Sequence, residues 1–319
     1  MRSSGVLMHI SSLPSPYGIG TMGAQAREFV DFLVKAGQQF WQVLPICPTS
    51  YGDSPYQSFS SFAGNPYFIS LEALITEGVL TREECESVDF GNKVNDIDYE
   101  KIYKNRYRLL RKAYERSNIT KNENYLRFVN ENSWWLSDYA LFMAVKERFG
   151  GIEWTQWAED IRLRWGFAMD YYRKELYFEI EFQQYMQFKF FEQWYCLKRY
   201  ANERGIQIIG DIPIYVAMDS ADTWANPKNY YIDEKGYPTL VAGVPPDYFS
   251  ETGQLWGNPL YNWEEHEKTG YQWWIDRIRY TLNMVDILRI DHFRGFESFW
   301  AVPFGDRDAT KGEWRKGPG

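Results

Sequence analysis

Four short apolar segments along the chain predict buried β-strands. They cover residues 5–13, 40–46, 206–215 and 285–290. Each is rich in branched or aromatic apolar residues, which is typical of parallel strands covered on both faces. Between the first two, residues 24–36 carry apolar side chains at helical spacing. A strand, a helix and a strand within about 45 residues predict a right-handed βαβ unit with parallel strands.

Between the second and third strand candidates the periodicity is helical, and Glu, Lys, Asn and Arg become more frequent. Helices are predicted over 99–116, 122–130, 134–149 and 176–200. In the last of these, aromatic residues recur every three or four positions from Phe178 to Tyr195, which predicts a stripe packed in the core. We interpret residues 71–175 as a helical insertion, because they are too long for a simple crossover.

The whole pattern predicts an α/β chain built of five consecutive segments. These are 1–70 with two strands and a long loop, 71–175 as a helical insertion, 176–216 with a helix and the third strand, 217–270 as an aromatic loop insertion, and 271–319 with a helix, the fourth strand and a final loop. Parallel strands bring the loops at their carboxyl ends to one edge. We therefore expect about the first half of a (β/α)₈ barrel, with a functional site at that edge.

Charged residues end the fourth strand candidate, in the stretch 286–295. Arg289 and Asp291 are two residues apart, so their side chains point to the same side of a strand. Two inward-facing charges are costly unless they pair or take part in chemistry. One interpretation is a buried ion pair that only holds the structure. The other is an active site, where ionic groups crowd the ends of barrel strands. Asp211, near the end of the third strand candidate, is expected to join them.

Composition narrows the range of partners. Aromatic residues make up 18% of the 319 residues, including 14 Trp, which favours flat ligands such as sugar rings. The net charge of −8 argues against nucleic acid or an anionic membrane as a partner. No apolar run approaches the ~20 residues that span a bilayer. Cys47, Cys85 and Cys196 are far apart, which indicates a reducing, cytoplasmic compartment, and no His/Cys cluster has zinc spacing.

Two loops that follow the first two strand candidates carry possible binding residues. The loop 18–23 matches the dinucleotide pattern G-x-G-x-x-G, but no acidic residue ends the second strand, as such a site requires. We interpret its glycines as turn residues and expect no cofactor. The loop 49–67 is polar and aromatic, and several of its side chains could contact a hydroxyl-rich ligand: Tyr51, Ser54, Tyr56 and Gln57. An ordered loop packed by its own aromatic residues is the alternative.

Carboxylates, an arginine and aromatic loops without a metal or dinucleotide motif favour glycosidic-bond chemistry, which uses two carboxyl groups. Arg289 would keep Asp291 ionised, so Asp291 is the candidate nucleophile. Asp211 could bind sugar hydroxyls. No acid within the four strand candidates is placed to act as the general acid.

Five motifs together resemble the 4-α-glucanotransferases of the amylomaltase type (disproportionating enzymes, glycoside hydrolase family 77), which are related to the α-amylases. The motifs lie at 4–20, 53–67, 210–216, 245–259 and 289–295. The resemblance implies a (β/α)₈ barrel with insertions and no cofactor. It also implies retaining transfer of 1,4-α-glucan segments among starch- or glycogen-type glucans and maltooligosaccharides, with glucose or maltooligosaccharides as acceptors.

The resemblance implies roles for single residues as well. Asp291 would be the nucleophile that forms a β-glucosyl-enzyme, with Arg289 as its partner. The residues that the resemblance implies in substrate binding are Tyr56 and Asp211 beside the scissile bond, Trp256 on the acceptor side and Tyr51 in a second glucan groove. Ser54 and His292 are further substrate-binding candidates.

The sequence departs from the family pattern after the fourth strand. The family's acid/base Glu and a third catalytic Asp lie on later strands, which are absent before Gly319. We therefore expect a truncated part of a longer enzyme, in which residues 311–319 form a loop. Two other functions remain open: a retaining α-glucan hydrolase, and a catalytically incomplete fragment that only binds glucan.

Overall fold

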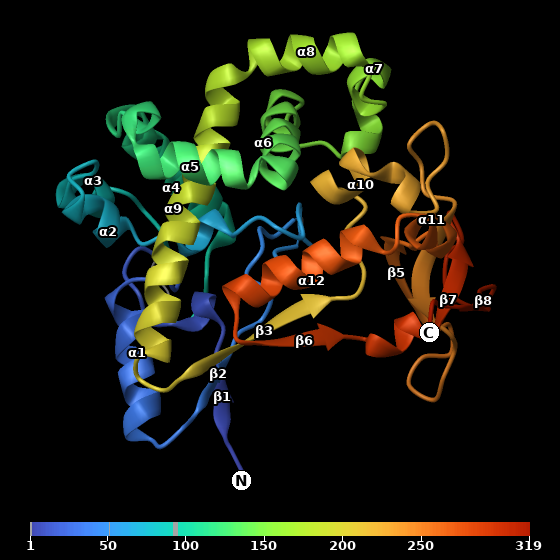
Figure 1. The fold of residues 1–319 in the computed structure, drawn as a ribbon, viewed down its shortest axis with the longest axis horizontal. Helices are drawn as coiled ribbons and strands as arrows, with labels where there is room; N and C mark the ends of the chain where they lie inside the picture. The colour runs from blue at the N-terminus through green and yellow to red at the C-terminus, as the bar shows by residue number, and fades with distance from the viewer. Residues whose placement is uncertain (1, 51, 92–94) are drawn as a thin grey trace.

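A four-stranded parallel sheet forms the centre of the computed structural model (Figure 1). Its strands, in spatial order, are β1 (Gly5–Leu7), β2 (Phe40–Gln42), β3 (Gln207–Pro213) and β6 (Ile287–Asp291). The structure describes residues 2–50, 52–91 and 95–319. All neighbouring strands are parallel, so the predicted set of four parallel strands is confirmed. Over the described residues the sheet is open and does not close into a barrel.

The first two strands are shorter than their apolar segments. β1 ends at Leu7, and the chain continues into a 3₁₀ turn, η1 (Ile10–Ser12). β2 ends at Gln42, shortly before Pro45, which has no N–H to donate to a ladder. Helix α1 (Ala24–Lys35) connects them, and this confirms the predicted βαβ unit.

Three helices pack beside the sheet: α1, α9 (Tyr177–Asn202) and α12 (Gln272–Met284). Figure 1 shows α12 running alongside β3 and β6, whereas α9 runs steeply past the start of β3 toward α1. The residue that follows α12 approaches β3 closely, because a Cβ at Gly210 would lie 2.7 Å from the side chain of Val285. A hydrogen bond of 2.9 Å from Trp194 Nε1 to the Met284 carbonyl joins α9 to the end of α12.

The described part of residues 71–175 is mainly helical, as its sequence pattern indicated, and its helices lie above the parallel sheet in the view of Figure 1. It contains α2 (Leu71–Thr76), α3 (Arg82–Glu86), α4 (Tyr99–Arg116), α5 (Glu123–Glu131), α6 (Ser133–Arg148), α7 (Glu159–Arg162) and α8 (Gly166–Glu175). The aromatic stripe of α9 is buried in its middle but not at its ends, since Phe178 is 70% and Tyr195 37% exposed. A helix of 26 residues, about 39 Å long, extends beyond the elements that pack on it.

A second sheet, which the sequence pattern did not predict, follows the carboxyl ends of β3 and β6 (Figure 1). It is antiparallel and contains, in spatial order, β5 (Gln254–Pro259), β4 (Leu240–Val244), β7 (Ser298–Pro303) and β8 (Glu313–Lys316). The expected aromatic loop over 217–270 thus includes two strands as well as α10 (Ala221–Ala225) and α11 (Trp263–Lys268). The prediction of a loop over 311–319 is wrong for the residues of β8, because Trp314 pairs with Trp300 of β7.

None of the helices in the described part of the chain combines the length and the apolar character that crossing a bilayer requires.

Candidate functional site

The ends of β3 and β6 bring Asp211, Arg289 and Asp291 together, as the sequence predicted. In the parallel register Asp211 lies opposite Arg289, and Pro213 lies opposite Asp291. Arg289 Nη1 donates a hydrogen bond of 2.6 Å to Asp211 Oδ1, and Nη2 donates one of 2.5 Å to Asp291 Oδ1. One guanidinium therefore bridges two carboxylates on neighbouring strands.

The two carboxylates differ in their exposure to solvent. The side chain of Asp211 is fully buried, whereas that of Asp291 is 42% exposed. A buried carboxylate is tolerated when hydrogen bonds replace its hydration. Asp211 meets this condition, because Tyr56 Oη also donates to its Oδ2 at 2.7 Å. The buried end of the network is thus structural, and the end at Asp291 is open to a ligand.

Electrostatics in this cluster follow from the same contacts. Hydrogen bonds from Arg289 to Asp211 and Asp291 raise the pKa of the guanidinium further above its usual value. Burial, together with the hydrogen bond to Asp211, raises the pKa of Tyr56 to about 12. Tyr56 is therefore a neutral donor at physiological pH, and Arg289 is a permanent cation.

The loop that carries Tyr56 is shaped by its own hydrogen bonds. The backbone N–H of Tyr56 bonds to Ser54 Oγ at 3.3 Å, and the N–H of Gln57 bonds to the Ser54 carbonyl at 3.1 Å. Ser54, expected to bind substrate, thus supports the turn that presents Tyr56, and its contact with substrate stays a prediction. Tyr51 lies outside the described residues.

An aromatic pair stands next to Asp291. The rings of Trp256, on β5, and His292 meet edge to face with centroids 4.9 Å apart. His292 has a φ of +54°, a left-handed conformation that is unfavourable for a residue with a side chain and is found mainly at turns and functional sites. Burial lowers the pKa of His292, although the charge of Asp291 opposes this effect. The second sheet therefore places an aromatic wall beside the strand that carries Asp291.

Arg277 of α12 is a supporting residue that the sequence pattern did not single out. It is 2% exposed and donates to the carbonyls of Pro213 at 2.7 Å and Ile214 at 3.1 Å, at the end of β3. A signal was present in the sequence, because Arg277 shares the apolar helix face of Trp274 and Thr281. An arginine on such a face needs buried acceptors.

The structure also bears on metal and dinucleotide sites. Among the described residues, no three or more His, Cys, Asp or Glu side chains are grouped to hold a metal ion. In the loop 18–23, Gly18 has a φ of +82°, and a Cβ at Gly20 would lie 1.7 Å from the Ile10 carbonyl oxygen. Both glycines are needed by the backbone conformation, in agreement with their interpretation as turn residues.

Comparisons with known proteins point to one family. A family model described as 4-alpha-glucanotransferase matches residues 8–319. The 4-alpha-glucanotransferases of Clostridium butyricum and of Streptococcus pneumoniae (strain TIGR4) are 51% identical over 312 residues and 52% identical over 320 residues. These alignments cover 98% and 100% of this chain, but only 64% and 63% of the two relatives.

A solved structure gives the same result. The amylomaltase from Streptococcus agalactiae in complex with acarbose superposes with a TM-score of 0.96 and is 44% identical. The match covers 100% of this chain and 65% of that protein. The chain therefore spans a little under two thirds of the length of the proteins that it resembles.

Proposed function

The chain belongs to the 4-alpha-glucanotransferase family, and we propose that the protein containing it transfers 1,4-α-glucan segments from one glucan to another. The donors are starch- or glycogen-type glucans and maltooligosaccharides, and the acceptors are glucose and maltooligosaccharides. Identities of about 50% over nearly the whole chain support this proposal. Three free cysteines, Cys47, Cys85 and Cys196, are consistent with a reducing compartment such as the cytoplasm.

The parallel sheet represents consecutive strands of a (β/α)₈ barrel in this proposal. The strand order β1-β2-β3-β6 and the helices beside it support this assignment. The polar cluster lies at the carboxyl ends of β3 and β6, which is the end where barrel enzymes carry their active sites.

Asp291 is the nucleophile. The observation that carries this assignment is the exposed Asp291 carboxylate, held at Oδ1 by Arg289, which is itself anchored on the buried Asp211. In the first step a carboxylate oxygen of Asp291 bonds to the anomeric carbon, and the glycosidic bond breaks with its electron pair going to the leaving oxygen, which takes up a proton. In the second step the acceptor hydroxyl loses its proton, bonds to the same carbon and displaces Asp291. Two inversions give net retention.

The other residues of the cluster bind and orient. Asp211 accepts hydrogen bonds at both oxygens, from Arg289 and Tyr56, and so positions these two side chains. Its carboxylate is buried, and its own contact with a sugar hydroxyl stays a prediction. Trp256 and His292 form the wall of the acceptor side. An apolar wall favours a sugar over water as acceptor, because it excludes solvent from the intermediate.

A maltotriose assay separates transfer from the two alternatives. Transfer redistributes chain lengths while the concentration of reducing ends stays constant. Hydrolysis by the same nucleophile raises the concentration of reducing ends. The assay is made on the complete protein that contains this chain. Binding of glucan without any change in either quantity would contradict the proposed activity.

A further inference from the structure

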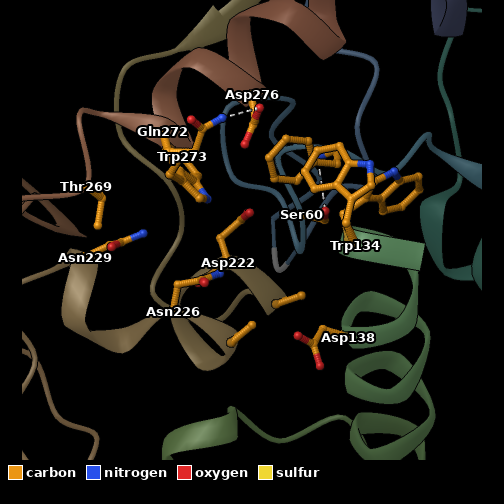
Figure 2. A pocket seen from close by; sticks show the side chains of 14 residues that line it. Ser60, Trp134, Asp138, Asp222, Asn226, Asn229, Thr269, Gln272, Trp273 and Asp276 are labelled. Carbon is orange, nitrogen blue, oxygen red and sulfur yellow. Dashed lines mark hydrogen bonds between the residues drawn. The ribbon is translucent and has the colours of Figure 1, made fainter. Parts of the chain in front are cut away.

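A cavity with a volume of about 320 Å³ lies between α6, α10 and α12 (Figure 2). This volume falls in the range of roughly 300–1,000 Å³ that is typical of small-molecule sites. The residues that line it do not include Asp211, Arg289, Asp291 or Trp256. The cavity is therefore distinct from the candidate active site.

An exposed tryptophan forms one wall of the cavity. Trp134 of α6 is 51% exposed, although it is a large apolar side chain. Its ring is held by edge-to-face contacts with Phe62, with centroids 4.9 Å apart, and with Tyr280, with centroids 5.8 Å apart. These contacts fix the orientation of the indole while half of its surface stays accessible. Such a preformed flat surface is suited to stacking against a ring.

Buried polar groups face the cavity from the other side. Asp222 of α10 is only 5% exposed. The backbone N–H of Ser61 donates a hydrogen bond of 2.7 Å to one of its two carboxylate oxygens, Oδ2. Figure 2 shows the Asp222 carboxylate directed into the space between Trp273 and Ser60. The indole N–H of Trp273 is buried and has no hydrogen-bond partner among the described residues. A buried donor and a nearby buried acceptor favour a ligand that both accepts and donates hydrogen bonds.

The charge of the lining narrows the ligand class. The lining contains Asp138, Asp222 and Asp276 but no Lys, Arg or His among the described residues, which disfavours an anion. Arg164 Nη2 pairs with Asp138 at 2.8 Å and Arg279 Nη1 pairs with Asp276 at 3.0 Å, so two of the three charges are already compensated. The amide side chains of the lining (Asn226, Asn229 and Gln272) can each donate and accept. A neutral polyhydroxy ring uses these groups better than an organic cation does.

We propose that this cavity binds a glucose unit of an α-glucan at a site separate from Asp291. One face of the sugar ring stacks on Trp134, while its hydroxyls donate to Asp222 and accept from the Trp273 indole. The cavity by itself indicates a neutral sugar ring, and the choice of an α-glucan rests on the proposed function. A second site of this kind holds a long glucan on the protein while another part of it occupies the catalytic cluster.

Calorimetric titration of the intact chain with maltopentaose tests this proposal. The measurement is made in the Asp291→Asn background, so that the glucan is not turned over. Two classes of site are expected. Trp134→Ala weakens one class about tenfold or more, and Trp256→Ala weakens the other. Gln272→Ala, which removes an exposed amide, weakens the Trp134-dependent class to a smaller extent.

A matched control is Trp165→Ala, since Trp165 is 44% exposed and does not line the cavity. This variant binds maltopentaose like the parent. Unchanged binding at both classes of site in Trp134→Ala overturns the proposal. So does a titration in which spermidine, but not maltopentaose, shows Trp134-dependent binding.

The test also distinguishes this inference from the proposed function. Maltotriose transfer is measured separately in chains that keep Asp291. If the protein shows transfer activity and the titration shows a single class of binding site that only Trp256→Ala weakens, the second site is overturned. The proposed transferase function is then unaffected. Trp134-dependent binding, together with no transfer by the complete protein that contains this chain, supports the second site and contradicts the proposed activity.

Discussion

Asp211 and Arg289 face each other in register on neighbouring parallel strands, and a hydrogen bond of 2.6 Å joins their side chains. Asp211 is buried and Arg289 is 44% exposed. The buried carboxylate therefore holds the arginine from the inside of the sheet, and the arginine holds the exposed Asp291. This arrangement gives the proposed nucleophile a fixed position without placing it out of reach of a substrate.

Replacing Arg289 tests this bridge. In Arg289→Lys the charge is kept, but a single ammonium does not reproduce the forked geometry that reaches two carboxylates. We expect the kcat for maltotriose disproportionation to fall by about 10²-fold, the usual effect of losing one preorganised donor. The control is Arg173→Lys, at a 51% exposed position with only a 3.8 Å contact to Asp170. An equal kcat in Arg289→Lys and Arg173→Lys would contradict the claim that the Arg289 bridge between the two carboxylates supports catalysis.

Removing the hydroxyl of Tyr56 tests the buried end of the cluster. Tyr56→Phe leaves Asp211 Oδ2 without its phenolic donor in a buried position. We expect a loss of about 1–2 kcal/mol in the free energy of unfolding, measured by urea denaturation. Tyr171→Phe, at a 57% exposed position, serves as the control and is expected to unfold like the parent. Identical curves for the two variants would show that the hydrogen bond is not stabilising.

The buried carboxyl of Asp222 is expected to make the free energy of unfolding depend on pH. Burial raises the pKa of its carboxyl to about 6, although Ser61 N–H and the charge of Arg277 act in the opposite direction. Because the pKa is raised on folding, this group favours the folded state below its unfolded pKa, and that contribution is lost as pH rises through about 6.

The substitution Asp222→Asn removes this titration. We expect the variant to be more stable than the parent by about 2–3 kcal/mol near pH 8, and the difference to shrink near pH 4. Urea unfolding at both pH values measures it, with Asp170→Asn, at an 84% exposed side chain, as the control. A stability difference that is the same at both pH values would show that titration of the buried Asp222 carboxyl is not its cause.

Two glycines provide a matched test of packing. A Cβ at Gly64 would lie 2.0 Å from the ring of Phe190, which is fully buried. We expect Gly64→Ala to lower the free energy of unfolding by about 1–3 kcal/mol. Gly166 begins α8, and a Cβ added there would have no atom within 4 Å, so Gly166→Ala is expected to be neutral or to stabilise by up to about 1 kcal/mol. Thermal unfolding of both variants checks the contrast.

The parallel sheet and the charged cluster could be predicted from local sequence. Strands β3 and β6 are apolar segments, and residues at the carboxyl ends of parallel strands meet at one edge. The antiparallel sheet could not be predicted in this way. Leu240 pairs with Pro303, and the local pattern of a segment does not show which distant segment it pairs with.

The supporting contacts of the site also depend on the complete fold. Tyr56 reaches Asp211 across 155 residues of sequence, and the loop pattern alone indicated only a hydroxyl-rich ligand. Trp256 was expected in a loop, but it lies on β5, which positions it against His292. Arg277 was visible as an arginine on an apolar helix face, yet its carbonyl partners at the end of β3 appear only in three dimensions.

The most direct test of the central claim is to trap the covalent intermediate on Asp291. The donor is α-maltotriosyl fluoride, because fluoride leaves without a proton from a general acid and the first step then depends on the nucleophile. After a rapid acid quench, intact-protein mass spectrometry and peptide mapping measure the adduct. We predict one maltotriosyl group on the peptide that contains Asp291, released when maltose is added and absent in Asp291→Asn. An adduct on another residue, or an equal yield in Asp291→Asn, would contradict the assignment of Asp291 as the nucleophile.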